Sequence, residues 1–302
     1  MVSRERLLRL GATVVEHATT KRVRAVAQLL LLAAIVFVAL RVRSIWHGSH
    51  IELSRVDWGA LAGALVLGAA GTAAGAPIWL AILEALGVRT QRRWMGLFFQ
   101  AQLGKYIPGS VWQYAGRAAI ARTSGIPVRP VGVSLPIEFV ASSAAGGSMA
   151  AFLLGWWGAV VVGAVAVLLA ASERLSRCQR PTVLATVRAA LLYLPSWVLL
   201  GASFWLCARG LLGVPVDDLA FYIGAFAVAF LAGLVAVYAP GGLGVREAVL
   251  VALLSSRIGA ANALVVAAAS RLVLILADVA LAGTATAALR RGRGRLDIVD
   301  AA

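Results

Sequence analysis

The chain is poor in charged residues, and its few cysteines and histidines are scattered. Only 14% of its 302 residues are charged, against roughly 25% in an average soluble domain. Cys178 and Cys207 lack the spacing of a metal-binding motif, and their positions, one in a basic loop and one in an apolar run, argue against a disulfide. His47 and His50 fit a polar loop better than a metal site. We therefore expect no metal ion and no cofactor.

Lysine is nearly absent, so arginine supplies almost all of the positive charge. Lys21 and Lys105 are the only lysines, although the formal net charge is +15. A charge of this size is also found in nucleic-acid-binding proteins, but here the basic residues lie mainly in short loops between apolar runs. That pattern is typical of a membrane protein, whose basic loops set its orientation. We expect no nucleic-acid partner.

Hydrophobic residues are what the chain has in excess. They make up 61% of the sequence, and the mean hydropathy is +0.88. Apolar runs that approach the roughly 20 residues needed to cross a bilayer recur throughout. This composition excludes a soluble domain and predicts an all-α integral membrane protein. The uninterrupted runs lie at about 25–40, 58–84, 131–154, 157–172, 186–208, 217–238 and 261–289.

The basic residues outside these runs predict three regions and an orientation. We expect a basic cytoplasmic segment at 1–24, a polytopic transmembrane domain at 25–290 and a cytoplasmic tail at 291–302. With both termini inside, nineteen basic residues lie on the cytoplasmic side and five outside, as the positive-inside rule requires. Both termini inside also requires an even number of crossings. The simplest arrangement is a helix bundle of about eight crossings, with 95–122 re-entrant.

Two similar tetrapeptides interrupt the apolar chain, 132 residues apart: Tyr106-Ile107-Pro108-Gly109 and Tyr238-Ala239-Pro240-Gly241. Proline removes a backbone donor and glycine disfavours a helix. Non-helical backbone at membrane depth is tolerated only where it is buried in protein or lines a wet cavity. Paired interruptions in the two halves of a chain favour broken helices, an internal repeat and a transporter-type binding site.

The helix that follows each break has features that suit an anion. Ser110 and Gln113 form a capping-box pattern after the first break, and a helix N-terminus offers free N–H groups and a positive dipole end. Lys105 and Arg117 flank the first break, and Arg246 follows the second. The glycines that permit close backbone approach after the second break are Gly241, Gly242 and Gly244. This segment is not a nucleotide-binding loop, because the Gly-Lys-Ser/Thr ending is missing.

Seven charged residues fall within segments expected at membrane depth. They are Lys105, Arg117, Glu138, Arg246, Glu247, Arg271 and Asp278. A charge facing lipid is costly, so each should face the protein interior, a cavity or a partner. Arg271 and Asp278 share a helix face but stand about 10 Å apart along the axis, so we expect them to pair with other helices. These charges are either structural counter-ions or ligand-binding groups.

The run 58–84 is also rich in small residues. Gly59 with Gly63, and Gly71 with Gly75, form two GxxxG pairs. Such pairs let a neighbouring helix approach closely, because no side chain stands between the two backbones. We therefore expect this run to pack tightly on another helix.

The motifs around both breaks resemble a known membrane domain. The stretch Gly104 to Trp112 with Arg117, Gly125 and Glu138, and the stretch Pro240 to Glu247 followed by Arg271-Leu272, are similar to the flippase-like transmembrane domain of lysylphosphatidylglycerol synthases. The resemblance covers roughly 25–290. It implies re-entrant helices around a central cavity, a multi-pass protein of the bacterial cell membrane, and movement of an aminoacylated phospholipid between leaflets. The soluble synthase domain is absent from this chain, so we do not expect an enzyme.

Three functions stay open at this point. The first is transport of an anionic or aminoacylated phospholipid, or of a polyprenyl-phosphate-linked lipid, with membrane lipids as the partners. The second is a non-catalytic membrane partner of a lipid synthase or glycosyltransferase. The third is an intramembrane lipid-phosphate enzyme, which the absence of clustered carboxylates disfavours. The candidate substrate-binding residues are Lys105, Tyr106, Pro108, Gly109, Ser110, Arg117, Glu138, Pro240, Gly241, Gly242, Gly244, Arg246, Glu247, Arg271 and Asp278.

Overall fold

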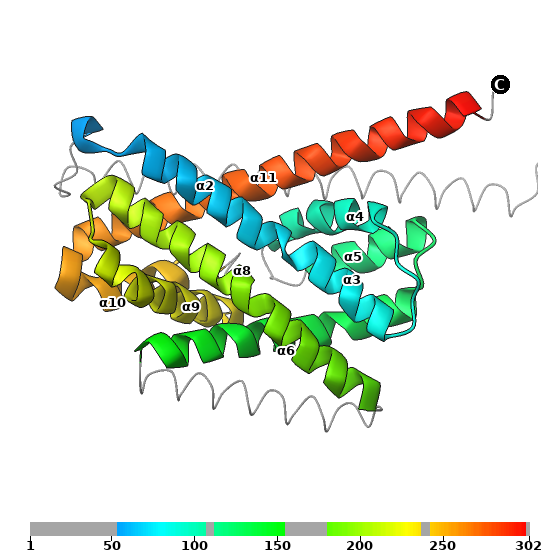
Figure 1. Cartoon of the computed structure of the whole chain (residues 1–302), viewed down its shortest axis with the longest axis horizontal. Coiled ribbons are helices and arrows are strands. Elements are labelled where there is room, and N and C mark those ends of the chain that lie inside the picture. The colour runs from blue at the N-terminus through cyan, green and yellow to red at the C-terminus, as the bar shows by residue number, and fades with distance from the viewer. Residues whose placement is uncertain (1–52, 107–111, 155–179, 237–241, 300–302) are drawn as a thin grey trace, which may run out of the picture. The chain divides into compact units, whose positions relative to one another are not determined.

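The computed structural model describes residues 53–106, 112–154, 180–236 and 242–299 (Figure 1). The chain divides into the units 1–44 and 45–302, and all described residues belong to the second. Every regular element in these ranges is a helix. The all-α prediction is therefore confirmed for this part of the chain. The runs 25–40 and 157–172 lie outside it.

The helices follow the predicted apolar runs closely. The α-helices are α2 (Trp58–Ala73), α3 (Gly75–Ala85), α4 (Arg93–Gln102), α5 (Trp112–Thr123), α6 (Val128–Leu154), α8 (Arg180–Leu212), α9 (Leu219–Val235), α10 (Val245–Ile258) and α11 (Ala260–Val299). Short 3₁₀ helices are η1 (Leu53–Arg55), η2 (Leu103–Tyr106) and η3 (Val216–Asp218). Asp57 caps α2, since its Oδ1 accepts a hydrogen bond from the backbone N–H of Ala60 at 3.0 Å.

Four helical segments in the described ranges are long and apolar enough to cross a membrane. They are Trp58–Ala85, Val183–Leu212, Val216–Val235 and Ala260–Leu289. Large apolar side chains also face outward, with Val66 65%, Phe152 85% and Leu184 71% exposed. Water would oppose so many exposed apolar side chains, whereas lipid accommodates them. The chain is a helical, membrane-embedded protein.

The glycines of α2 form its contact with α8. A Cβ on Gly63 would lie 3.2 Å from Leu206, and one on Gly71 would lie 2.8 Å from Leu200. Two α8 serines also donate hydrogen bonds to α2 carbonyls: Ser203 to Ala64 at 2.6 Å, and Ser196 to Gly71 at 2.8 Å. The prediction that the glycine pairs admit a neighbouring helix is confirmed for Gly63 and Gly71. Gly75 instead faces Phe98 of α4.

Aromatic side chains hold α8 and α9 together in the core. Trp197 of α8 lies edge-on to Phe230 of α9, with ring centroids 5.1 Å apart. Phe204 contacts Tyr222 and Phe226, at 5.6 and 5.8 Å. Such pairs add about 0.5–1.5 kcal/mol each beyond the area that they bury. The backbones also approach closely, because Gly201 of α8 lies against Ile223 of α9.

Each predicted break is flanked by helices that end beside it. The segment 107–111 lies between η2 and α5, and 237–241 lies between α9 and α10. Helices α4 and α5 are each only 10–12 residues long and lie side by side (Figure 1). Helix α10 has 14 residues, fewer than an upright crossing needs. The second apolar segment is thus interrupted within the described ranges, since Ala236 and Gly242 to Gly244 are not α-helical, whereas residues 107–111 and 237–241 lie outside those ranges.

Replacing Gly201 with alanine tests the α8–α9 contact. The new Cβ would lie 2.7 Å from the Cα of Ile223, so the backbones must separate, and we expect a loss of about 1–3 kcal/mol in stability. The measurement is the melting temperature in detergent, read from the monodisperse fraction that remains after heating. Gly283→Ala on α11 is the matched control, because a Cβ there meets nothing within 4 Å. Equal melting temperatures for the two variants would contradict this packing.

Candidate functional site

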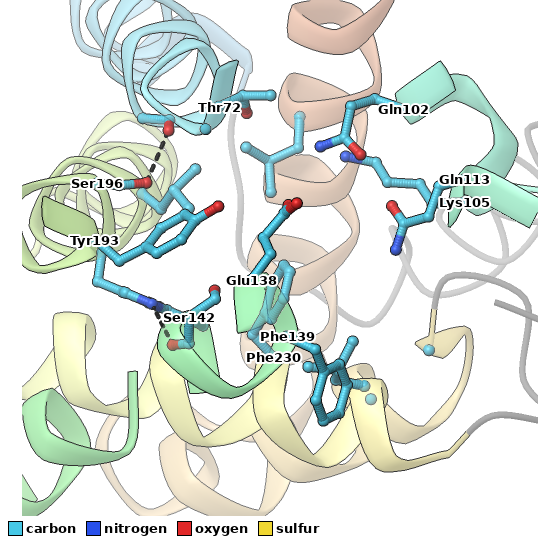
Figure 2. A pocket seen from close by; sticks show the side chains of 18 of the residues that line it. Thr72, Gln102, Lys105, Gln113, Glu138, Phe139, Ser142, Tyr193, Ser196 and Phe230 are labelled. Atoms are coloured by element: carbon cyan, nitrogen blue, oxygen red, sulfur yellow. Dashed lines mark hydrogen bonds between the residues drawn. The ribbon is translucent and has the colours of Figure 1, made fainter. Parts of the chain in front are cut away.

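A partly open cavity of about 180 Å³ lies where the two interrupted segments meet the long helices (Figure 2). Gly71 and Thr72 of α2, Ser196 of α8 and Arg271 of α11 all line it. These residues lie near the middle of three of the four candidate spans. The cavity therefore lies at mid-depth in the helix bundle. Its volume is far above the roughly 10–15 Å³ that one water molecule requires.

The first interrupted segment contributes a cluster around one carboxylate of α11. Lys105 of η2 forms an ion pair with Asp278, at 2.7 Å between Nζ and Oδ2, and the Tyr106 hydroxyl donates a hydrogen bond to the same oxygen. Asp278 is only 2% exposed. Lys105 and Tyr106 line the cavity, whereas Asp278 lies behind them. The carboxylate therefore anchors η2 to α11 and neutralises the lysine.

Arg117 of α5 is bound on two sides of its guanidinium. Its Nη1 and Nη2 donate to the two oxygens of Glu138 on α6, with 3.0 Å between Nη2 and Oε1. Its Cζ also lies 4.3 Å from the ring centre of Phe98. Both members of the pair are buried. This two-point geometry is the one that arginine forms best with a carboxylate, so Glu138 occupies the fork that was expected to bind a ligand.

After the second break, the start of α10 is capped by a carboxylate of the chain itself. Glu247 accepts a hydrogen bond from the backbone N–H of Gly244 at 2.7 Å, which caps the start of α10. Its other oxygen forms an ion pair with Arg271 of α11 at 2.5 Å. A carboxylate at a helix N-terminus also offsets the positive end of the helix dipole. The Gly244 N–H that was expected to be open to an anion is thus already taken.

These contacts confirm the expectation that Arg271 and Asp278 pair with other helices. Arg271 reaches Glu247 on α10, and Asp278 reaches Lys105 on η2. Arg246 and Glu247 are adjacent in α10 but do not form an ion pair with each other, because neighbouring residues on a helix point in different directions. Each of the three carboxylates that the structure describes beside the cavity therefore has one basic partner.

Arg246 is the remaining cation beside the cavity in the part of the chain that the structure describes. It lines the cavity, and its Cζ lies 4.5 Å from the ring centre of Phe230 and 5.3 Å from that of Phe226. Within the described part of the chain, its guanidinium has no hydrogen-bonded oxygen and no ion-paired carboxylate. Aromatic faces stabilise a guanidinium, but they supply no oxygen acceptors. Its N–H donors are therefore available to a ligand in the cavity.

Two glycines position Arg246. Gly242 has a φ of 70° and approaches α9 so closely that a Cβ on it would lie 2.7 Å from the Cα of Gly233. A Cβ on Gly233 would in turn lie 2.8 Å from Cδ of Arg246. Both glycines line the cavity. Gly242 was predicted from its neighbouring glycines, whereas Gly233 lies in a uniformly apolar run that offers no signal.

The rest of the wall is uncharged and combines apolar side chains with a few polar ones, most of which were not predicted from the sequence. Figure 2 shows the hydroxyl of Tyr193, the amides of Gln102 and Gln113, and the side chain of Thr72 around the open centre. Gln113 was noted only as a helix cap. These residues come from α2, α4, α5 and α8. Single polar residues inside apolar helices are common, so only their convergence reveals them.

The fifteen predicted site residues fall into three groups. Those that line the cavity are Lys105, Tyr106, Arg117, Glu138, Gly242, Arg246 and Arg271. Those placed just behind it are Gly244, Glu247 and Asp278. Those outside the described ranges are Pro108, Gly109, Ser110, Pro240 and Gly241. The flanks of the two breaks thus converge on one cavity. Within the described ranges, no group of three or more His, Cys, Asp or Glu residues could hold a metal ion.

No protein-family model matches the chain, and no curated protein matches it either. The resemblance to the lysylphosphatidylglycerol synthase membrane domain therefore stays a prediction that rests on the motifs. The function has to be argued from the cavity and its charges.

The Arg117–Glu138 pair can be tested by a double-mutant cycle. Arg117→Met or Glu138→Leu alone leaves one buried charge without its partner, and we expect each to cost about 3–5 kcal/mol. The double variant removes both charges, so most of that stability should return. The measurement is thermal unfolding in detergent for all four proteins.

The exposed pair Arg257–Asp218, at 2.7 Å, is the matched control. Breaking it should cost at most about 1 kcal/mol, because water screens both charges. The double variant Arg117→Met, Glu138→Leu could prove no more stable than the less stable of the two single variants. That result would show that the two side chains do not neutralise each other's charge.

Proposed function

We propose that this protein is a lipid transporter that binds the phosphate of a lipid headgroup in the mid-depth cavity and moves the lipid between leaflets. The observation that supports this most is Arg246, a cation on the cavity wall with no oxygen partner among the described residues. A charge at this depth is costly unless it is paired. An incoming phosphate would supply the missing partner, and arginine is the side chain that matches phosphate oxygens best.

The surroundings of the cavity support the same proposal. It lies between helices interrupted in two separate parts of the chain, as in transporters whose broken helices meet near the bilayer midplane. Its walls combine apolar rings with a few polar groups, which is the usual composition of a ligand site. Its partly open form provides a path for a headgroup, while the acyl chains stay in lipid.

The proposal includes the finer features expected from the sequence. We propose a bundle of about eight crossings with re-entrant helices, in the bacterial cell membrane and with both termini in the cytoplasm. Membrane lipids are the proposed partners. Lys105 and Arg117 were expected to bind the phosphate themselves, but both are neutralised by carboxylates. We therefore propose that they shape the cavity around Arg246. Similarity to the lysylphosphatidylglycerol synthase membrane domain supports the class of function.

Substitution of Arg246 tests this function. Purified protein is reconstituted into liposomes containing a fluorescent phosphatidylglycerol, and the fraction of probe that reaches the outer leaflet is followed with a membrane-impermeant quencher. Charge-assisted hydrogen bonds contribute about 1.5–3 kcal/mol, so Arg246→Ala should slow lipid movement roughly tenfold or more. Arg246→Lys should recover little, because a point charge cannot reproduce the fork.

Arg257→Ala is the control on the same helix. Arg257 also lies over an aromatic ring, with its Cζ 4.0 Å from the ring centre of Phe221, but it pairs with Asp218 and does not line the cavity. Its rate should stay within about twofold of the parent rate, since surface pairs contribute little. Normal lipid movement by a well-folded Arg246→Ala variant would refute the proposal, as would no movement by the parent protein.

A further inference from the structure

We infer that the cavity selects a phosphodiester headgroup that bears hydroxyl groups and rejects one that bears an ammonium group. This inference rests on the proposed function and narrows it, since the proposed function admits both anionic and aminoacylated lipids. It is carried by two independent features of the wall, namely the distribution of paired charges and the positions of its neutral polar side chains.

Among the described residues, the charge distribution leaves no unpaired carboxylate for an ammonium group. The described carboxylates around the cavity are Glu138, Glu247 and Asp278, and each already binds a cation of the chain. An ammonium could gain one of them only by displacing Arg117, Arg271 or Lys105, which would leave a buried positive charge without a partner. Breaking a buried pair in this way is strongly unfavourable.

The wall also has one net positive charge. Among the described residues, four cations meet three carboxylates there, and Arg246 is the one that remains without a carboxylate. A phosphodiester has a single negative charge and would balance this excess. An aminoacyl ester of the same headgroup adds positive charge beside Arg246, where low dielectric strengthens repulsion. Electrostatic complementarity therefore favours a headgroup with net negative charge.

The uncharged polar side chains of the wall are placed to hydrogen-bond the part of the headgroup beyond the phosphate. Thr72 and Gln113 line the cavity, and neither side chain has a hydrogen-bond partner among the described residues. Gln102 accepts a bond from Arg117 through Oε1, at 3.3 Å, so its amide N–H₂ group still has donors to offer. Hydroxyl and amide groups both donate and accept, as do the hydroxyls of glycerol or a sugar. A cavity of about 180 Å³ has room for such a small polyol.

A competition experiment separates these features. Purified protein in mixed micelles binds radiolabelled dioleoyl phosphatidylglycerol, which is then displaced by unlabelled lipids with the same acyl chains. Dioleoyl phosphatidylethanol has the same single negative charge and no hydroxyl. Lysylphosphatidylglycerol keeps the phosphate and adds ammonium groups, and soluble glycerol 3-phosphate lacks the acyl chains. We expect phosphatidylglycerol to compete at least tenfold better than each of the other three.

The outcomes distinguish this inference from the proposed function. If phosphatidylglycerol binds and moves but lysylphosphatidylglycerol competes equally well or better, the inference fails and the transport proposal stands. Equal competition by phosphatidylethanol would overturn the hydroxyl requirement, and equal competition by glycerol 3-phosphate would overturn a lipid as the source of the phosphate. If no phosphate lipid binds or moves at all, both proposals fail together.

Two variants provide a second test of this selectivity. Gln113→Leu should remove most of the preference for phosphatidylglycerol over phosphatidylethanol, while binding of phosphatidylethanol stays within about twofold, because the phosphate contact is unchanged. Arg246→Ala should weaken both lipids by tenfold or more. If the Gln113→Leu variant still binds phosphatidylglycerol and still prefers it over phosphatidylethanol, the uncharged polar side chains of the wall do not recognise hydroxyl groups.

Discussion

The neutralisation of charge at membrane depth is the constraint on which the rest of this structure depends. An isolated charge in hydrocarbon is costly, so each carboxylate near the cavity binds a basic side chain. Each pair also links a segment beside a break to another helix: Lys105 of η2 to Asp278, Arg117 of α5 to Glu138, and Glu247 of α10 to Arg271. The broken segments, which are too short to be stable alone, are thereby fixed to α6 and α11.

The cavity follows from the same constraint. Because the paired charges neutralise one another, most of the described wall has no net charge, and the positive charge that remains there belongs to Arg246. Its place is set by packing, since Gly233 and Gly242 bring α9 and the start of α10 so close that only an unsubstituted Cα fits on either side. Phe226 and Phe230 then stabilise the guanidinium without supplying an oxygen. The result is one positive site, held by rigid elements, that suits an anion.

The sequence predicted the positions of the helices better than it predicted which residues on different helices contact one another. The run expected at 261–289 corresponds to the candidate span Ala260–Leu289, and the run at 58–84 to Trp58–Ala85. Hydropathy succeeds here because the requirement to satisfy backbone groups internally acts on each segment by itself. The number of crossings, the re-entrant course of 95–122 and the orientation stay predictions. They depend on the membrane and on segments that the described ranges do not include.

Sequence alone determined that this is a helical membrane protein, and it predicted that two apolar segments are interrupted and that seven charged residues lie at membrane depth. These are local properties of composition and order. Tertiary structure decided which charged and polar groups meet, because Arg271 lies 24 residues from Glu247 in the chain and Tyr106 lies 172 residues from Asp278. It also left Arg246 without a carboxylate partner among the described residues and brought Thr72, Gln102 and Gln113 to the same cavity. Ion pairing and hydrogen bonding act over a few ångströms in space, and only the folded chain brings these groups that close.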